Sequence, residues 1–480
     1  MNTLGRTFTI MATALVVLLP MQSALAQFAG GAGTVGDPWQ ISNCSELEEA
    51  DNLDTYYDDH FILINDIDCA GEPGSGYPLW PRANQGGRQD GIGAFGGAYS
   101  FGGTFDGQGF SIANRSQSFL NTQRPPKGGT PAVYRNIVFT NMFITNHPLV
   151  QLTGYVGGVM PAMYTGANPS FFNIHVHGIV SNMTGSGNTG GMIANCSGVT
   201  ISNCSANVAV YGGGSVGGLV GTLSGASSVM TGSHAYGDVN GTAGTVGGLI
   251  GSLTGGSVYQ CSAHGDVFRA SGEYVGGLIG GISGACTVRE CFATGDVSHN
   301  TAQGGGFVGL TIGGQTVLIE DCYSTGDNSG SDNGDKNGGF VGSYARTTTG
   351  KHVINRCYSA GDVLMASGNG FVGNGGGANG NYVSNSFVSA TTVLSSTRGF
   401  SSGLQALNVV NCFWTNSASG VDASGATKVS NESYFYDTAN APVDGWNSTT
   451  IWCFTGDALP CLRWDEDCCP PPKGSVVWFE

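Results

Sequence analysis

The sequence predicts an all-β fold, a single-stranded parallel β-helix with about 30 residues per coil. Three observations support it. Glycine accounts for 82 of 480 residues, only 10% of residues are charged, and a Gly-Gly-apolar-apolar segment recurs about nine times between Gly154 and Trp414. Successive copies begin 27 to 33 residues apart, as from Gly247 to Gly276. A fixed period of this length is typical of solenoid proteins.

Each repeat is expected to form one coil of short strands. It contains three short runs of β-forming residues separated by Gly, Ser, Asn and Asp, and it lacks the helical periodicity of a helix pair. Strands of successive coils would then pair about 4.8 Å apart, so that equivalent residues stack in columns.

The second half of the repeat is a Cys followed by a turn that ends in Gly-Asp. Because Ser233 and Ser386 fill the same position in other coils, we expect this column to point inward as small apolar side chains. No Cys-x-x-Cys spacing supports a metal site in it. The column comprises Cys204, Cys261, Cys291, Cys322, Cys357 and Cys412.

These repeats resemble the GLUG-motif proteins. The motif is seen in Gly218-Leu219-Val220-Gly221 and in Gly248-Leu249-Ile250-Gly251. Residues 103–112 resemble the hairpin that precedes the repeats in such proteins, and residues 411–414 and 459–464 resemble their usual ending. The resemblance implies a right-handed β-helix on secreted or surface proteins, including bacterial adhesins and some peptidases, and it bears on fold more than on function.

The chain divides into an export signal, two caps and the coils. Residues 1–26 read as a signal peptide with Ala24-Leu25-Ala26 as the cleavage site, which implies a secreted or cell-surface protein. Ser45 and Glu48 predict a capping box for a short helix in the N-terminal cap. The expected regions are 27–72 (N-terminal cap), 73–153 (first coils with the hairpin), 154–414 (repeat coils), 415–464 (C-terminal cap) and 465–480 (tail).

Two disulfides are expected in the caps. Cys44 and Cys69 flank the N-terminal unit and are expected to pair, closing a loop of 25 residues. Cys453 and Cys461 lie across a turn and are the pair that we favour in the C-terminal cap. Because Cys468 and Cys469 follow, three pairings of these four residues stay open.

The charge balance limits the partners. The chain has 17 basic and 33 acidic residues, a net charge of −16, which argues against nucleic acid and anionic membrane surfaces. No run after residue 26 approaches the roughly 18 apolar residues of a membrane helix, so no membrane insertion is expected. Self-association through the apolar tail is an open alternative.

One carboxylate per coil defines an aspartate column. Gly-Asp is ordinary turn chemistry, because Asp accepts hydrogen bonds from backbone amides. Weak Ca²⁺ binding is the alternative, since calcium prefers oxygen ligands; no other cofactor is expected. The column comprises Asp238, Asp266, Asp296, Asp327 and Asp362.

Acids and bases also cluster just before the Cys column, at Arg289, Glu290, Glu320, Asp321 and Arg356. Enzymes that cleave polysaccharides on a β-helix use such groups, so a polysaccharide lyase or glycoside hydrolase is the alternative function. A solvated ion-pair ladder explains the same residues without catalysis.

We therefore expect a non-enzymatic secreted or surface-associated protein that binds glycans, matrix or cell surfaces. A rigid solenoid presents long flat faces that suit repeated weak contacts. His175 and His177 share one side of a strand, and without a third ligand we interpret them as exposed polar positions.

Overall fold

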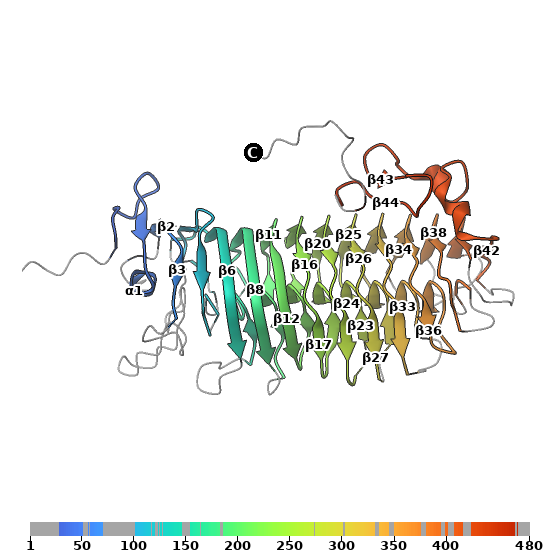
Figure 1. Cartoon of the computed structure of the whole chain (residues 1–480), viewed down its shortest axis with the longest axis horizontal. Helices are drawn as coiled ribbons and strands as arrows, with labels where there is room; N and C mark the ends of the chain where they lie inside the picture. Colours follow the sequence, from blue (N-terminus) through green and yellow to red (C-terminus); the bar gives the residue numbers. More distant parts are fainter. Residues whose placement is uncertain are drawn as a thin grey trace, which may run out of the picture.

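The computed structural model describes most of residues 28–468, and the longest gaps are residues 71–100, 146–153, 402–407 and 416–423. It is a parallel β-solenoid of about nine coils with roughly 30 residues each and little helix, drawn along its axis in Figure 1. The predicted fold class is confirmed. Residues 1–26, the predicted signal peptide, and the tail after Cys468 lie outside the described residues.

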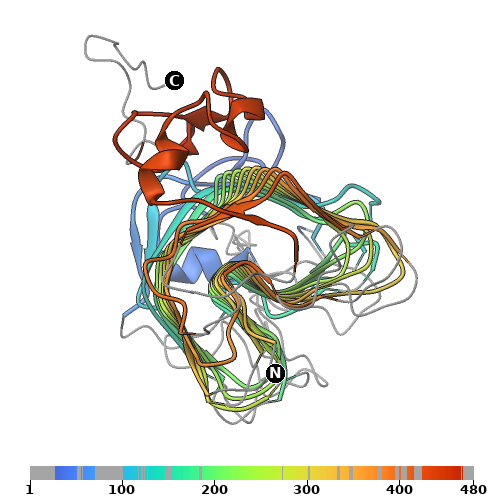
Figure 2. The same ribbon diagram turned by 90° about the vertical axis from the view of Figure 1, so that its right-hand side faces the viewer.

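Each regular coil contributes up to five short strands, and each pairs in register with its counterparts in the neighbouring coils. Val258 pairs with Val288 and Val288 with Ile319, for example. Viewed along the axis, the coils superimpose (Figure 2).

The strands of the five rows have the following bounds. The first row holds β11 (Thr200–Ser202), β15 (Val229–Thr231), β20 (Gly256–Tyr259), β25 (Cys286–Arg289), β30 (Val317–Glu320), β34 (His352–Asn355), β38 (Tyr382–Ser384) and β40 (Val409–Val410). The second holds β16 (His234–Ala235), β21 (Ser262–Ala263), β26 (Phe292–Ala293), β31 (Tyr323–Ser324), β35 (Tyr358–Ser359), β39 (Phe387–Val388), β41 (Phe413–Trp414) and β42 (Thr427–Lys428). The third holds β17 (Val239–Gly241), β22 (Val267–Arg269), β27 (Val297–His299), β32 (Asn328–Gly330) and β36 (Val363–Leu364). The fourth holds β7 (Val156–Gly157), β9 (Thr189–Gly190), β13 (Val216–Gly217), β18 (Thr245–Gly247), β23 (Tyr274–Gly276) and β28 (Gln303–Gly305). The fifth holds β10 (Ile193–Ser197), β14 (Val220–Ser224), β19 (Ile250–Leu253), β24 (Ile279–Ser283), β29 (Val308–Ile312), β33 (Val341–Tyr344) and β37 (Val372–Gly375).

The Gly-Gly pair of the repeat lets the coils approach closely. A Cβ atom on Gly248 would lie 2.1 Å from the carbonyl oxygen of Gly277 in the next coil, and one on Gly247 would lie 2.1 Å from the oxygen of Ile250. Real side chains do not tolerate such distances, so only glycine fits. The next residue points into the core, where Phe307, Phe340 and Phe371 stack with centroids 4.6 and 4.9 Å apart.

The first coils differ from the regular ones. Their strands β6 (Val133–Thr145), β8 (Ser170–Asn182) and β12 (Ser205–Gly212) run on without a break. Residues 103–112, where we expected a hairpin, instead hold β4 (Thr104–Asp106) and the start of β5 (Ser111–Ala113), which pair in parallel with other strands rather than with each other. The turn between them exists, but parallel stacking replaces the hairpin.

The N-terminal cap contains helix α1 (Cys44–Glu49) and the strands β1 (Trp39–Ile41), β2 (His60–Leu63) and β3 (Ile67–Asp68). The helix lies at the end of the cylinder (Figure 1), and Leu47 is fully buried in the main core. Its cap is Asn43, which accepts a bond of 2.9 Å from the amide of Glu46, so the expected capping box at Ser45 and Glu48 was placed two residues too late.

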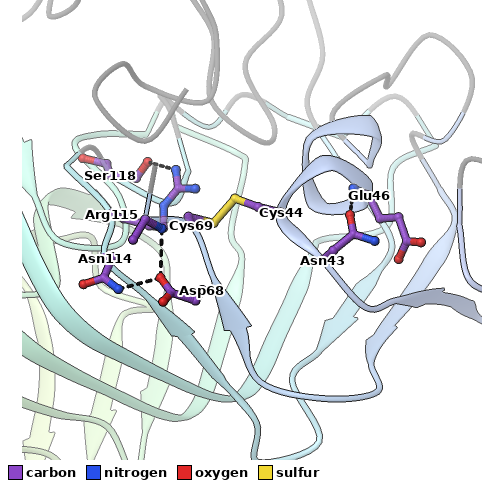
Figure 3. The surroundings of a disulfide bond; sticks show 9 residues. Asn43, Cys44, Glu46, Asp68, Cys69, Asn114, Arg115 and Ser118 are labelled. Atoms are coloured by element: carbon purple, nitrogen blue, oxygen red, sulfur yellow. Dashed lines mark hydrogen bonds between the residues drawn. A yellow bond between two sulfur atoms is a disulfide. The ribbon is translucent and has the colours of Figure 1, made fainter. Parts of the chain in front are cut away.

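Cys44 and Cys69 form a disulfide with Cα atoms 5.5 Å apart, which ties the helix to the end of β3 (Figure 3). Next to it the Asp68 carboxylate accepts hydrogen bonds from the Asn114 amide and the Ala70 backbone. The expected pair between Cys453 and Cys461 was wrong, because Cys461 pairs with Cys468. Cys453 lies opposite Cys461 between β43 (Trp452–Cys453) and β44 (Cys461–Leu462), but it belongs to another disulfide.

The C-terminal segment does not sit where a cap would. Strand β42 extends the second row, and residues 429–465 then run back along the outside of the solenoid (Figures 1 and 2). This segment includes the short helices η2 (Glu432–Tyr436) and η3 (Val443–Gly445). We call residues 429–465 the docked segment. Its described part covers one side of the cylinder, whereas we had expected residues 415–464 to close the end.

Candidate functional site

Each coil turns a corner between its first-row and second-row strands. One outward side chain per coil comes at the start of the second row, just after this corner, and we call these residues the outer row. Strand register places them in a single column along the solenoid axis. The column changes character halfway: its first four members are His or Ser, and its last five are Phe or Tyr. In order, the outer row is His175, Ser205, His234, Ser262, Phe292, Tyr323, Tyr358, Phe387 and Phe413.

The aromatic half is a platform for the docked segment. Tyr323 stacks between Phe292 and Tyr358 with ring centroids 4.9 and 5.0 Å away, and the planes are within 6° of parallel. Trp446 and Trp452 of the segment pack on these rings in a second hydrophobic core that is separate from the interior of the solenoid. Aromatic contacts of this kind add to the burial of apolar surface.

Hydrogen bonds fix the segment on the platform. The Tyr358 hydroxyl donates to the carbonyl oxygen of Pro460 at 2.8 Å, and the Tyr323 hydroxyl donates to the Asp465 carboxylate at 3.1 Å. Burial raises the pKa of both tyrosines well above the ordinary value. Both therefore remain protonated donors across the physiological range.

The docked segment reaches the histidine half of the outer row only through Trp464, and its other described residues do not cover that half. His175 Nδ1 is hydrogen-bonded to Ser205 Oγ at 2.8 Å, and His234 Nδ1 to Ser262 Oγ at 2.8 Å. Ser262 Oγ also bonds His264 at 2.8 Å. Burial, with smaller contributions from His264 and His175, lowers the pKa of His234 to about 4, so its imidazole is neutral at pH 7.

Four of the five predicted acid and base residues form a ladder at the corner before the Cys column. Glu320 lies 2.7 Å from the Arg289 guanidinium and 3.7 Å from that of Arg356. Arg356 makes two bonds of 2.7 Å to Asp321. Glu290 is not part of this chain of contacts, because its carboxylate accepts from Gln260 at 3.0 Å.

This ladder replaces an amide ladder of the other coils. Glu290, Asp321 and Arg356 have positive φ angles near 50°, as do Asn203 and Asn385 at the same corner. Asparagine tolerates this conformation best, so the charged residues accept local strain. Asp321 is 1% exposed, and the indole of Trp452 donates to it at 3.0 Å. The ladder thus joins the coils to the docked segment.

The predicted aspartate column makes one repeated hydrogen bond. The Asp266 carboxylate accepts from the amide of Asp296 at 2.9 Å, and the Asp296 carboxylate accepts from the amide of Asp327 at 2.8 Å. Asp238 and Asp362 make the same bond to the following coil. Within the described residues, no group of three or more His, Cys, Asp and Glu side chains is arranged to hold a metal ion.

The Cys column points inward and is buried. Its thiols bond to carbonyl oxygens, as Cys291 does to Arg289 at 3.0 Å. Burial raises the pKa of Cys204 and Cys412 to about 12, which keeps these thiols protonated and unreactive.

A flat outward face lies beside the outer row, on the strands of the first row. Two columns of side chains stay in register along it and are all exposed or half-exposed. They are mainly hydroxyl-bearing, apolar and aromatic, and Arg289 and Glu320 neutralise each other. The columns are Ser170, Thr200, Val229, Ser257, Thr287, Leu318, Val353 and Tyr382, and Phe172, Ser202, Thr231, Tyr259, Arg289, Glu320, Asn355 and Ser384.

Residues 271–298 match the family model described as the GLUG motif. The match confirms the resemblance to the GLUG-motif proteins, and the matched residues carry this motif within the β-solenoid. No curated protein matches the chain.

Two solved structures are similar to it. One, provisionally described as an immunoglobulin A1 protease from Bacteroides ovatus, is 16% identical, with 92% of this chain and 96% of that chain covered and a TM-score of 0.39. The other, described as IgA1 protease, is 15% identical, with 67% of this chain and 22% of that chain covered and a TM-score of 0.40. At this similarity neither likeness bears on what the chain does.

Sequence reasoning missed the outer row and its histidines. His175 is half-buried and bonded to Ser205, whereas only His177 is exposed as expected. A usable signal was present: the residue two positions after the corner is Ser or His up to Ser262 and aromatic from Phe292 onward. The pairing of that change with the aromatic C-terminal segment required the fold.

Proposed function

We propose that this chain is a non-enzymatic binding protein that attaches to glycans on matrix or cell surfaces through the flat face of the first row. The observation that carries the proposal is the pair of in-register columns described above. Hydroxyl-bearing and apolar side chains recur along each column about every 4.8 Å, which is the spacing between strands. A repetitive neutral polymer can contact such a face many times, so weak contacts add up.

Exposed aromatic rings on this face support sugar binding. Tyr259 is 38% exposed and Tyr382 is 41% exposed, and Phe172 lies further along at 37%. Apolar ring surface with a polar edge suits ligands that have both an apolar face and hydroxyl groups. The net charge of −16 disfavours polyanions as ligands.

An extracellular location fits the covalent chemistry. The described residues form disulfides, among them Cys44–Cys69 and Cys461–Cys468, and disulfides persist in oxidising compartments. We propose that residues 1–26 direct export. None of the described helices has the length and hydropathy needed to span a bilayer.

The proposal is tested by incubating the purified protein with a panel of polysaccharides, with and without Ca²⁺, while bound protein and released reducing ends are both measured. We expect binding without release. Tyr259→Ala and Tyr382→Ala should each weaken binding about three- to tenfold, the loss of one aromatic contact. Phe268→Ala, which removes a 37% exposed ring from the third row, is the matched control and should have no effect.

Release of oligosaccharide that disappears in Glu320→Gln or Arg289→Ala would overturn the proposal and make the chain a polysaccharide-cleaving enzyme. Absence of binding to every polysaccharide would overturn glycan recognition itself.

A further inference from the structure

Trp464 of the docked segment fills a gap in the outer row. Its ring centroid lies 5.6 Å from that of His234 and 5.1 Å from that of Phe292. These two residues belong to coils on either side of Ser262, whose small side chain leaves room for a ring above it. The indole therefore occupies a slot with two ring walls and a serine floor.

The same arrangement occurs two coils earlier, without an indole. Ser205 lies in register between His175 and His234, as Ser262 lies between His234 and Phe292. The hydrogen bond from the preceding histidine to the serine is repeated at the same length, 2.8 Å in both coils. No ring of a described residue stacks on His175, and Ser205 is half-buried rather than covered.

The dimensions of this second slot suit one six-membered ring. Two strand spacings separate its walls, about 9.6 Å, so a ring in the middle would lie about 5 Å from each imidazole. This is the separation of the stacked rings elsewhere in the row, where Tyr323 and Tyr358 have centroids 5.0 Å apart.

The rim of the slot is polar. The Asn207 amide and the His177 ring are exposed beside it on the next outward positions, which are paired in register. Burial lowers the pKa of His175, and that of His234 more strongly, so both walls are uncharged at neutral pH. A ligand that fits is a single ring with apolar faces and with hydroxyl groups on its edge, and it carries no charge.

We propose that the slot formed by His175, Ser205 and His234 binds one pyranose ring of a neutral glycan. The ligand class rests on the proposed function, but the site is separate from the flat face. The ring lies between the two imidazoles, and its hydroxyl groups reach Asn207 and His177.

The test is to fill the slot with a larger side chain of the protein itself. Ser205→Phe places a ring where Phe292, Tyr323 and Tyr358 have theirs, so this variant is expected to fold and keep its melting temperature. Binding of a neutral polysaccharide that the wild type retains should fall at least tenfold. Ser205→Ala leaves the slot open and should bind within twofold of the wild type.

Ser298→Phe is the matched control, because it adds the same ring on the third row, where its register neighbour is Phe268. It should not change binding. If Ser205→Phe fails to fold, His175→Ala replaces it: this change removes one wall and should also weaken binding at least tenfold.

The outcomes separate the two proposals. A wild type that binds while folded Ser205→Phe binds equally well overturns the slot but leaves glycan binding by the flat face intact. A wild type that binds no neutral glycan overturns the proposed function, and the slot with it.

Discussion

The two halves of the outer row differ in sequence by one residue per coil and differ completely in what covers them. From Phe292 onward the row is aromatic, and the docked segment buries it in a core of its own. From His175 to Ser262 the row alternates His and Ser, and the only ring of the docked segment that reaches it is Trp464. The strands stay in register through both halves, although β8 and β12 run on without a break where the later coils have shorter strands.

The comparison shows that the outward residue of each coil determines locally whether the surface of the solenoid is covered by another segment. Since every coil offers an equivalent outward position, a run of rings creates a docking platform, and a run of small polar residues leaves open surface. The docked segment also marks the boundary between the two halves, because Trp464 supplies the ring that Ser262 lacks. The following changes would break or sharpen this difference.

The largest effect is expected from removing a ring of the platform. Tyr358→Ser creates at this coil the residue found at Ser262 and also removes the bond to Pro460. Buried aromatic side chains are worth about 3–5 kcal/mol. We expect amide hydrogen exchange of residues 429–465 to accelerate strongly, measured by mass spectrometry. Ser205→Ala, in the other half, should leave it unchanged; unaltered exchange in Tyr358→Ser would refute docking on the platform.

The next effect concerns the buried ion pair beneath Trp452. Asp321→Ala leaves Arg356 without its closest partner and should lower the free energy of unfolding by about 3–5 kcal/mol, measured by urea denaturation. Asp321→Asn should cost clearly less, because Asn occupies this corner at Asn203 and Asn385. Equal losses for the two variants would show that charge, and not the corner conformation, decides stability here.

Acid should destabilise the protein through its buried histidines. Burial, with a smaller contribution from Arg269, lowers the pKa of His299 from 6.5 to about 4 in the folded state. The unfolded chain therefore takes up this proton first, so the free energy of unfolding falls as the pH drops from about 6.5 to about 4. The loss is at most about 3 kcal/mol for this residue. His299→Gln should flatten that part of the stability curve; an unchanged slope would contradict the assignment.

The smallest effect is expected in the aspartate column. Asp296→Ala should cost about 1 kcal/mol, since it removes one exposed hydrogen bond to the amide of Asp327. Asp296→Asn keeps an acceptor oxygen and should be nearly neutral in thermal melts. Titration calorimetry decides the calcium alternative: we expect no heat of Ca²⁺ binding, and a saturable signal lost in Asp296→Asn would establish the column as a calcium site.

The periodic part of the molecule was predictable, because each coil repeats the same physical requirements. Glycine pairs mark close approaches between coils, and Cys291 and its equivalents fill an inward position. These patterns recur, so they can be read without structure. The ion pair between Arg289 and Glu320 followed from the same register.

Contacts that occur only once in the chain, outside the repeat, could not be predicted from the sequence. The partner of Cys461 depends on how the C-terminal segment folds back, and the turn at Thr455-Gly456-Asp457 between Cys453 and Cys461 favoured Cys453 over Cys468. The burial of Asp321 depends on Trp452, which lies 131 positions away. No local pattern reports such a contact, and the slot at Ser205 becomes visible only by comparison with Trp464.

The most direct test of the contrast between the two halves is tyrosine nitration of the folded protein, read by peptide mass spectrometry. Tyr323 and Tyr358 should resist the reagent, because the docked segment buries them to 4% and 2% exposure, whereas Tyr236, 47% exposed beside the histidine half, should react. Trp452→Ala should make Tyr323 and Tyr358 reactive without changing Tyr236. Nitration of all three tyrosines at similar rates in the wild type would contradict the central claim that the outer row is covered in one half and open in the other.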